Sequence, residues 1–468
     1  MQAPVVVVGL GRSGMGAARL LAARGADVCV IERSSEAGMQ QRASLLLGEG
    51  IQVELGQPLE LESFTALPRW PALAVVSPGI RFDHPVLDQL RDRGCAVVGE
   101  MEVAWEASKG VPWVGITGTN GKTTVTSLVG HLLRAGGLDA PVSGNIGASA
   151  AEQALACFEG SRPDWCVVEL SSYQIEAAPS VSPSIGVWTT LTPDHLDRHV
   201  TLERYRSIKA SLLRRSGIQI LNGDDPDLLH HAAEWPDARW VTAGPRDGLK
   251  GIEPHLWIDG DQICDATGVL FPATALAMPG RHNRQNLMLS VAVSRACGLT
   301  TSQIESGCRT FPGVPHRLER LRQRSGVTYY NDSKATNYDA ALVALQALEY
   351  PLVVLAGGQA KRGEPGAWLS ALKQKAAAVV LFGEATPTFR ELLGASGYGG
   401  RIEQREHLEA AVPLAAQLAG ELGATAVLLS PACASFGAAI TFASLWRPWH
   451  EVQAPMVVDE KRARRLRH

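Results

Sequence analysis

Residues 114–124 read Val114-Gly115-Ile116-Thr117-Gly118-Thr119-Asn120-Gly121-Lys122-Thr123-Thr124, and a segment with helical periodicity follows. A short apolar run, a glycine-containing loop and a helix in this order are typical of a phosphate-binding loop. The loop N–H groups would face phosphate oxygens, Lys122 would reach the β- and γ-phosphates, and the Thr123 hydroxyl could bind Mg²⁺. The strict motif has a glycine where Ile116 stands, so an ordinary glycine turn is the alternative interpretation.

On both sides of this loop, apolar runs of strand length alternate with helical patterns. Such alternation predicts α/β domains with mainly parallel sheets. At roughly 150 residues per domain, the 468 residues correspond to about three domains. The candidate boundaries are the segments at 108–112 and 312–317. We therefore predict domains at residues 1–108, 109–314 and 315–468.

Composition excludes several classes of protein. The 44 basic and 47 acidic residues leave a net charge of −3, which argues against a general nucleic-acid coat, and 46% hydrophobic residues argue against a disordered scaffold. Eight cysteines without a CxxC pair argue against a zinc ribbon or a disulfide framework and favour a reducing compartment. No apolar run approaches the ~18–20 residues of a membrane span, and no leader pattern opens the chain. We expect a cytoplasmic protein without a membrane or nucleic-acid partner.

A second glycine turn, Gly9-Leu10-Gly11-Arg12-Ser13-Gly14, follows the first apolar run. Glycines there allow a tight turn and bring N–H groups and a helix N-terminus close to a phosphate. Glu32 ends the next predicted strand, where an acidic residue of a dinucleotide-binding fold holds a ribose hydroxyl. The pattern fits NAD, another nucleotide, or a strand turn without a ligand. The hypothesis of an NAD-dependent dehydrogenase would not explain the phosphate-binding pattern at residues 114–124.

Polar residues also stand at other predicted strand ends. Glu169 closes the apolar strand 165–170, and His195 lies in the polar loop after the strand 185–191. Strand exits are where open α/β sheets bind ligands, so we predict a metal role for this pair rather than a structural one. Residues 330–337 and 429–435 form two further polar strand exits. Cys433 has no base near it in sequence, which disfavours a nucleophilic role.

Taken together, these segments resemble the Mur ligase family. The motifs that carry the resemblance occur in the family's order and run from the first strand to near the C-terminus. Besides the first glycine turn, they are Gly118–Thr123, Glu169–Gln174, Asp194–Asp197, Tyr205–Lys209, Gly280–Asn286, Pro315–Arg317, Asn331–Asn337 and Ser430–Ser435.

The resemblance implies an α/β protein of three domains: a Rossmann-like UDP-binding N-terminal domain, a central P-loop ATPase domain with a mainly parallel sheet, and a Rossmann-like amino-acid-binding C-terminal domain. The Asp-Asn-Pro-Arg motif of the diaminopimelate-adding members is absent. The implied activity is therefore ATP-dependent addition of D-glutamate to UDP-N-acetylmuramoyl-L-alanine through an acyl phosphate, with release of ADP and phosphate, in peptidoglycan precursor synthesis. The implied cofactors are ATP and two Mg²⁺ ions, and we expect a monomer.

The resemblance also implies roles for individual residues. The expected catalytic group is Lys122, Glu169, His195 and Lys209. ATP would contact Gly118, Thr119, Asn120, Gly121, Lys122, Thr123, Thr124, Asn286, Arg317 and Asp332. The metal ligands would be Thr123, Glu169, His195 and a carbamylated Lys209. The UDP substrate would contact Arg12, Ser13, Glu32, Arg33, Ser77 and Asn145, and D-glutamate would contact Lys334, Thr336, Lys361, Ser435 and Phe442.

Lys209 is the least obvious of these residues, because its helical segment alone favours an exposed lysine. An ammonium group beside Mg²⁺ would be repelled, whereas carbon dioxide adding to a neutral amine gives a carbamate anion that Mg²⁺ prefers. The chain departs from the family pattern at Glu32-Arg33, where Asp-Thr is usual, and at 436–449, where a phenylalanine-rich stretch ending in Arg-Gly is usual.

Overall fold

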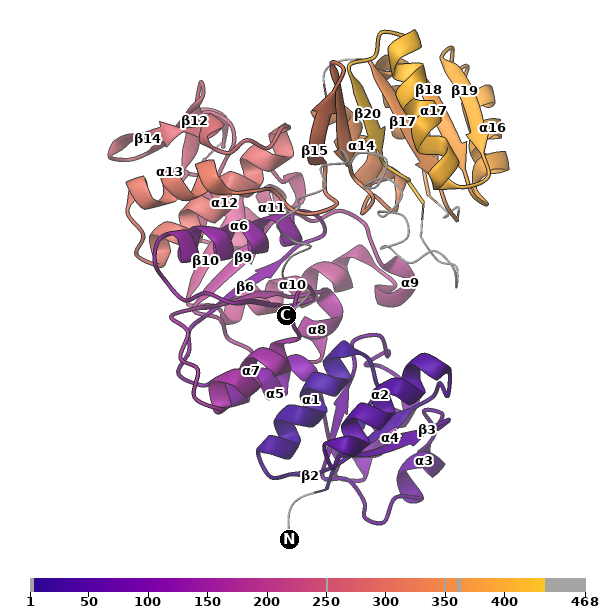
Figure 1. Ribbon diagram of the computed structural model, residues 1–468. Helices are drawn as coiled ribbons and strands as arrows, with labels where there is room; N and C mark the ends of the chain where they lie inside the picture. Colours follow the sequence, from indigo (N-terminus) through magenta and orange to yellow (C-terminus); the bar gives the residue numbers. More distant parts are fainter. Residues whose placement is uncertain (1–3, 250, 349–350, 360–362, 434–468) are drawn as a thin grey trace, which may run out of the picture. The chain divides into compact units, whose positions relative to one another are not determined.

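The computed structural model describes residues 4–249, 251–348, 351–359 and 363–433. These residues form two compact units, one within residues 1–277 and 283–311 and the other within residues 278–282 and 312–468. The large sheets of both units are parallel or mainly parallel and are covered by helices (Figure 1). The predicted α/β class is confirmed.

The first unit begins with a fully parallel five-stranded sheet in the order β3-β2-β1-β4-β5. Its order reverses at β1, which creates a crevice at the strand ends of the kind that binds ligands. The strands are β1 (Pro4–Val8), β2 (Asp27–Glu32), β3 (Gln52–Leu55), β4 (Leu73–Val76) and β5 (Ala96–Gly99). The helices are α1 (Arg12–Ala23), α2 (Ala37–Gly48), α3 (Leu61–Thr65), α4 (Pro85–Asp92) and α5 (Glu100–Ala107).

A second parallel sheet of the same unit has six strands in the order β11-β10-β9-β6-β8-β7. The strand that precedes the predicted phosphate loop, β6, lies inside it. The strands are β6 (Trp113–Thr117), β7 (Val142–Gly144), β8 (Cys166–Glu169), β9 (Ile185–Trp188), β10 (Ile218–Asn222) and β11 (Arg239–Val241). Its helices are α6 (Lys122–Ala135), α7 (Ala150–Phe158), α8 (Ser172–Glu176), α9 (Leu196–His199), α10 (Leu202–Arg215) and α11 (Pro226–His230), with the 3₁₀ turns η1 (Ala232–Glu234) and η2 (Arg246–Gly248).

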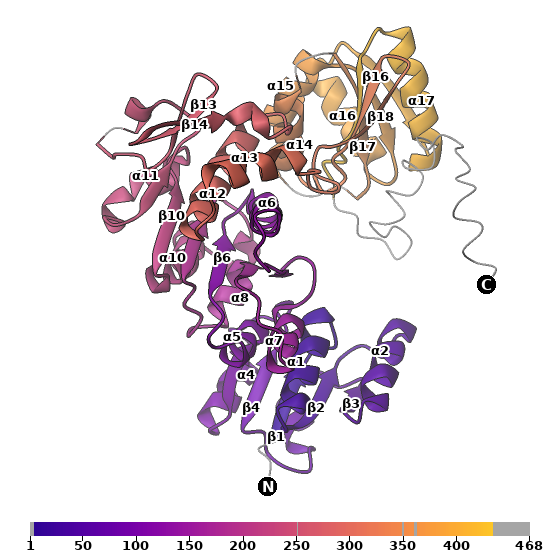
Figure 2. The same cartoon turned by 60° about the vertical axis from the view of Figure 1, so that its left-hand side comes forward.

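Beyond this sheet the first unit carries a small antiparallel sheet and two further helices (Figure 2). These elements are β12 (Trp257–Asp259), β13 (Gln262–Asp265), β14 (Gly268–Pro272), the 3₁₀ turn η3 (Ala273–Ala275), α12 (Arg281–Ala296) and α13 (Thr301–Thr310). α12 begins within the second unit and continues into the first from residue 283.

The two large sheets of the first unit are joined by α1, α5 and α7, which lie side by side in Figures 1 and 2. The packing is close: a Cβ atom added to Gly16 would lie 2.2 Å from the Ser149 hydroxyl oxygen. The buried Glu100 carboxylate accepts a hydrogen bond from the Ala151 N–H at 2.6 Å. The proposed domain boundaries at 108 and 314 stay predictions.

The described residues of the second unit form a six-stranded sheet in the order β15-β16-β20-β17-β18-β19, in which β15 and β16 pair antiparallel and the other neighbours pair parallel. α14, α15 and α16 bury apolar side chains against one face, and α17 buries its own against the other. The strands are β15 (Glu319–Arg324), β16 (Val327–Asn331), β17 (Leu352–Gly357), β18 (Ala376–Phe382), β19 (Arg401–Arg405) and β20 (Ala426–Leu429). The helices are α14 (Tyr338–Ala347), α15 (Gly366–Lys375), α16 (Thr386–Ala395) and α17 (Leu408–Glu421).

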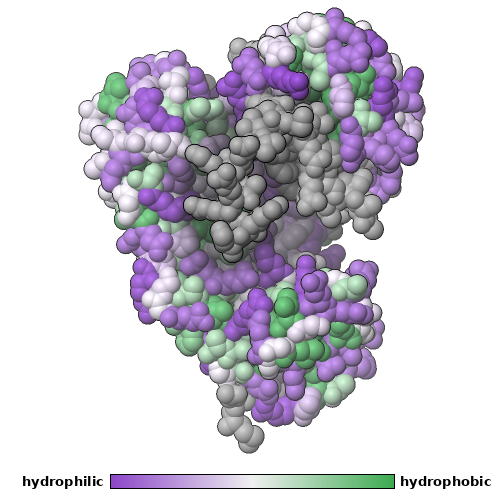
Figure 3. Space-filling model, in the orientation of Figure 1, coloured by the Kyte–Doolittle hydropathy of each residue, from purple (hydrophilic) through white to green (hydrophobic). Residues whose placement is uncertain are grey.

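On the face drawn in Figure 3, apolar side chains gather only in small separate patches. Within the described part of the chain, no helix combines the length and the apolar character needed to cross a lipid bilayer.

Candidate functional site

The predicted phosphate loop connects β6 to α6, and its shape depends on two glycines. Gly118 and Gly121 have φ angles of 147° and 84°, in the range that favours glycine. A Cβ atom on Gly118 would lie 1.9 Å from the Thr189 hydroxyl oxygen, and one on Gly121 would lie 2.6 Å from Asn286 Oδ1. The loop is therefore pressed against the end of β9 and against α12. Asn286, a predicted ATP contact, lies directly beside it.

Polar contacts hold the same loop in place. Lys122 Nζ donates to the carbonyl oxygens of Gly118 and Thr119, both at 2.8 Å. The Asn120 N–H donates to the Thr190 hydroxyl at 2.9 Å. Thr123 and Thr124 are buried in the first turn of α6. The predicted ATP contacts of residues 118–124 thus form one continuous loop and helix start.

Lys209, from α10, reaches the base of this loop. Its side chain is almost fully buried, and its Nζ donates to the Gly118 carbonyl oxygen at 2.9 Å. Nζ also lies 4.5 Å from the centre of the Tyr205 ring. Burial, together with the nearby Lys122 ammonium, lowers the pKa of Lys209 well below its usual range, while Asp194 and Glu169 act in the opposite direction. The residue is therefore a buried amine with a reduced tendency to hold a proton.

Glu169 ends β8 with its side chain buried. Oε1 accepts a hydrogen bond from Asn145 Nδ2 at 2.9 Å, whereas Oε2 has no hydrogen-bond partner in the described part of the chain. A buried carboxylate oxygen without a donor is costly unless a cation or a donor reaches it. The donor chemistry fits a hard cation such as Mg²⁺, for which carboxylate oxygens are preferred ligands.

His195 lies less deeply than Glu169. Its side chain is about half exposed, its Nε2 is 3.5 Å from Asp194 Oδ2, and its ring centre is 5.3 Å from that of Tyr173. Among the residues that the structure describes, no three His, Cys, Asp or Glu side chains converge on one point as metal ligands. The metal roles of Glu169, His195, Thr123 and Lys209 stay predictions.

A cavity of about 540 Å³ opens at the exits of β1, β2 and β4 in the N-terminal sheet. Five of the six residues predicted to contact the UDP substrate line it. They are Arg12, Ser13, Glu32, Arg33 and Ser77. Other lining residues were not singled out from the sequence, among them Gln57, Leu59, Ile80, Arg81 and His84. Several of these follow Ser77-Pro78-Gly79, which comes directly after β4, the neighbour of β1. Their position after the end of this strand could have indicated from the sequence that they line the site.

Both carboxylate oxygens of Glu32 accept hydrogen bonds from backbone N–H groups beside this cavity. Oε2 accepts from the Leu10 N–H and Oε1 accepts from the Ser34 N–H, both at 2.8 Å. The two carboxylate oxygens thus hold the turns that follow β1 and β2. An acidic residue that holds a ribose hydroxyl of NAD needs an oxygen directed at that hydroxyl.

Arg12 and Asn145 join the cavity to the second sheet. Arg12 Nη1 donates to the Gly147 carbonyl oxygen at 2.6 Å, and Nη2 donates to that of Gly144 at 3.2 Å. Asn145 does not line the cavity. It belongs to the loop that Arg12 contacts, and it bonds to Glu169 through its side chain and through its backbone N–H.

The predicted site residue Asp332 follows β16 in the second unit, beside the exit of β20. Asp332 Oδ1 accepts from the Leu318 N–H and Oδ2 accepts from the Ser430 hydroxyl, each at 3.0 Å. Burial raises the pKa of Asp332 to about 7. Lys334 and Thr336 follow in the same loop, and the Arg317 charge acts on Asp332. Lys361, Ser435 and Phe442 lie outside the described residues.

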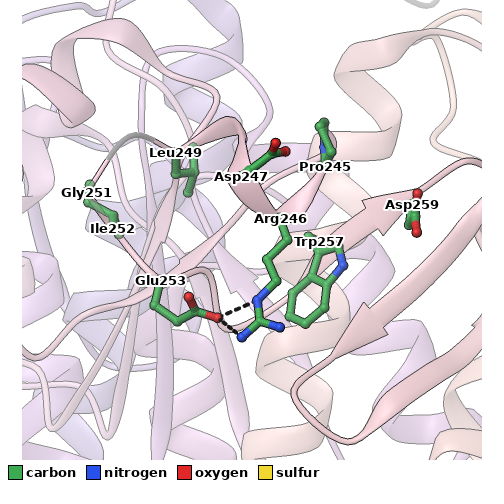
Figure 4. A pocket seen from close by; sticks show the side chains of 9 residues that line it. All are labelled: Pro245, Arg246, Asp247, Leu249, Gly251, Ile252, Glu253, Trp257 and Asp259. Atoms are coloured by element: carbon green, nitrogen blue, oxygen red, sulfur yellow. Dashed lines mark hydrogen bonds and ion pairs between the residues drawn. The ribbon is translucent and has the colours of Figure 1, made fainter.

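A second cavity, of about 780 Å³, lies between residues 245 and 259 (Figure 4). The Arg246 guanidinium stacks 4.9 Å from the centre of the Trp257 ring, and its Nε donates to Glu253 at 2.7 Å. None of the predicted site residues lines this cavity.

Comparison with known proteins identifies the family. Residues 3–99 match the model of the Mur ligase MurD-like N-terminal domain, residues 116–294 the Mur ligase middle domain, and residues 316–433 the Mur ligase glutamate ligase domain. The UDP-N-acetylmuramoylalanine–D-glutamate ligase of Prochlorococcus marinus (strain MIT 9313) is 53% identical over 438 residues, covering 93% of this chain and 95% of that protein. The enzyme of the same name from Synechocystis sp. is 46% identical over 92% of this chain and 94% of its own.

Solved structures show the same fold at lower identity. The UDP-N-acetylmuramate–alanine ligase of Thermotoga maritima matches with a TM-score of 0.59 at 19% identity, over 96% of this chain and 99% of that chain. Folylpolyglutamate synthase from Mycobacterium tuberculosis, complexed with ADP, matches with a TM-score of 0.56 at 18% identity, over 71% and 90%. With three family models in order along its length and relatives about half identical to it, this chain belongs to the Mur ligase family, beside the UDP-N-acetylmuramoylalanine–D-glutamate ligases.

Proposed function

We propose that this protein is an ATP-dependent ligase that joins D-glutamate to UDP-N-acetylmuramoyl-L-alanine through an acyl phosphate, releasing ADP and phosphate, in peptidoglycan precursor synthesis. The proposal is carried by three features of one site. They are the loop that depends on Gly118 and Gly121, the buried Lys209 amine, and the buried Glu169 Oε2, which has no hydrogen-bond partner among the described residues. The names of relatives that are 46–53% identical over almost the whole chain support the choice of substrates.

The reaction brings two anions together, since the substrate carboxylate attacks the γ-phosphoryl group of ATP. The protein must therefore neutralise charge and hold both partners in line. Lys122 and the loop N–H groups would bind the β- and γ-phosphates, and Asn286 would position the nucleotide beside Gly121. Bound Mg²⁺ would screen the phosphate charge, with Thr123, Glu169, His195 and the carbamate of Lys209 as its proposed ligands.

The remaining sites divide between the two units. The 540 Å³ cavity would hold the UDP part of the first substrate, with the α1 N-terminus directed at its diphosphate. The Asp332 segment and Arg317 would contact the nucleotide, and Lys334 and Thr336 would contact D-glutamate, together with Lys361, Ser435 and Phe442. We further propose that the enzyme works as a monomer in the cytoplasm on these small-molecule substrates.

The test is phosphate release from ATP in the presence of UDP-N-acetylmuramoyl-L-alanine. D-glutamate, L-glutamate, L-lysine and diaminopimelate would be added in separate reactions at the same concentration. We expect phosphate release to depend on D-glutamate alone. Equal release with another amino acid would contradict the assignment of the acceptor, and no release with any of them would contradict the ligase.

A further inference from the structure

The segment that carries His195 has an unusual backbone. α9 is a single turn, and the residues on either side of it, His195 and Val200, have φ angles of 54° and 67°. Positive φ is uncommon for histidine and a genuine outlier for a β-branched valine. Such a conformation persists only where the surrounding structure holds it in place. The contacts of α9 therefore determine where the His195 ring lies.

Two residues inside α9 supply such contacts: His199, which is buried and hydrogen-bonded through Nε2 to the Ser172 hydroxyl at 2.9 Å, and Arg198. The Arg198 side chain is only 9% exposed. Nη1 donates to Asp83 Oδ1 at 2.8 Å and Nη2 donates to Glu176 Oε2 at 3.1 Å. The guanidinium carbon lies 5.3 Å from the centre of the Tyr173 ring, and that ring is also the one packed against His195. One arginine thus ties the strained turn to α8 and to the N-terminal sheet.

Asp83 links the same arginine to the nucleotide cavity. It lies between Arg81 and His84, which both line that cavity. Arg81 donates to both oxygens of Asp83, at 3.1 and 3.0 Å. The Arg81 side chain is 54% exposed and can be reached by a ligand, whereas Arg198 is enclosed. The Asp83 carboxylate therefore accepts hydrogen bonds from an arginine of the cavity wall and from an arginine of the His195 turn, while Arg204 of α10 lies farther away, 3.9 Å from Oδ2.

We propose that Asp83 and Arg198 are positioning residues that couple occupancy of the UDP cavity to the placement of His195. Ligand oxygens that engage Arg81 withdraw its hydrogen bonds from Asp83 and leave Arg198 as the nearer of the two remaining arginines on the carboxylate, which tightens the turn. This inference rests on the proposed function, because it takes the cavity as the UDP site and His195 as a group at the reaction centre. The alternative is that the ion pairs only join the two sheets and transmit nothing.

Hydrogen exchange distinguishes these roles, with UDP as the probe. In the wild-type protein we expect UDP to slow amide exchange in residues 195–200 by about fivefold or more, the lower end of typical coupling between sites. Asp83→Asn keeps the side-chain volume and removes the charge, and we expect it to abolish this slowing while UDP still binds by calorimetry. The matched control is Asp88→Asn, which removes an exposed ion pair with Arg91 on α4 of the same sheet.

Steady-state kinetics provide the second measurement. Asp83→Asn and Arg198→Gln should lower kcat more than they raise the KM for the UDP substrate, and Asp83→Glu should restore part of the loss. The coupling would be overturned if UDP slowed amide exchange in residues 195–200 equally in the wild type and in Asp83→Asn. It would also be overturned if Asp83→Asn and Asp88→Asn showed the same exchange and kinetics. Neither result would affect the assignment of the cavity. Absence of UDP binding to the wild-type protein would instead overturn the assignment of the cavity, and the coupling with it.

Discussion

Lys209 shows how far a single residue can depart from what its local sequence suggests. Its helix segment reads as exposed, yet the amine is buried under the phosphate loop and its pKa is lowered by burial. A neutral amine is the form to which carbon dioxide adds, and the product reverses the sign of the charge presented to a cation. We predict that Lys209→Ala loses most ligase activity and that acetate, which can fill the vacated space with a carboxylate, restores part of it.

The measurement for Lys209 is phosphate release at increasing acetate concentration, with chloride at matched ionic strength as the control. The wild-type enzyme should not be stimulated by acetate. Full activity of a folded Lys209→Ala protein without acetate would rule out the carbamate.

Lys122 is expected to act on the reaction and not on the fold. Its Nζ donates to the loop carbonyl oxygens of Gly118 and Thr119, and the residue is only partly buried, so its removal takes little from an apolar core. We predict that Lys122→Ala abolishes ligation, because the charge on the transferring phosphoryl group loses its stabilisation, while thermal unfolding shifts by less than about 2 °C. Wild-type turnover in a folded variant would contradict the phosphate-binding role of the loop.

At the scale of elements, periodicity and glycine turns predicted the strands and helices that hold both nucleotide loops. The run Val5–Val8 forms the expected strand, because an apolar run of this length is typical of a strand buried on both faces of a parallel sheet. The loop at residues 118–121 lies where expected, because its positive φ angles favour glycine. The α9 turn could not be predicted, since its two left-handed residues are not glycines and are held by distant side chains. Arg12 illustrates the same limit: its place in the glycine turn suggested a ligand contact, while its hydrogen bonds go to carbonyls about 130 residues away.

The junction of α5 and α7 should make stability depend on pH. Glu100 is buried, Oε1 accepts from the Ala151 N–H, and burial raises the pKa of Glu100 to about 7. A carboxyl whose pKa is raised on folding stabilises the protein below its unfolded pKa of 4.5, and this stabilisation is lost as pH rises towards 7. We predict that the unfolding free energy of wild type relative to Glu100→Gln falls by up to roughly 3 kcal/mol between pH 5 and pH 8.

Denaturant unfolding of both proteins at several pH values provides the measurement for Glu100. The glutamine keeps an acceptor for the Ala151 N–H, and Asp332, whose pKa is also raised by burial, contributes equally to both proteins and cancels in the difference. Parallel pH profiles would show that Glu100 does not titrate in this range.

At the scale of the whole molecule, two glycine turns lie at the strand exits of two sheets of one compact unit, and we propose that each binds a different nucleotide. The sequence pattern of the first turn alone left NAD open, because the spacing of Gly9, Gly11 and Gly14 fits a dinucleotide fold as well as a UDP site. What separates these readings is the side chain of Glu32, whose two oxygens already accept from the Leu10 and Ser34 N–H groups. These two hydrogen bonds to the carboxylate cannot be inferred from the spacing of the glycines.

We therefore predict that the first cavity binds UDP and UDP-sugars and does not bind NAD. Both Glu32 oxygens already accept from the Leu10 and Ser34 N–H groups of the turns that follow β1 and β2, and a ribose hydroxyl that displaced either donor would leave a part-buried N–H without this partner. Calorimetry with UDP, UDP-N-acetylmuramoyl-L-alanine and NAD gives the comparison, and Lys122→Ala serves as a background in which the ATP loop is impaired. Binding of the uridine ligands should be unchanged in that variant, because their cavity lies at the strand exits of the other sheet. Tight NAD binding without UDP binding would contradict the assignment of the first cavity to UDP.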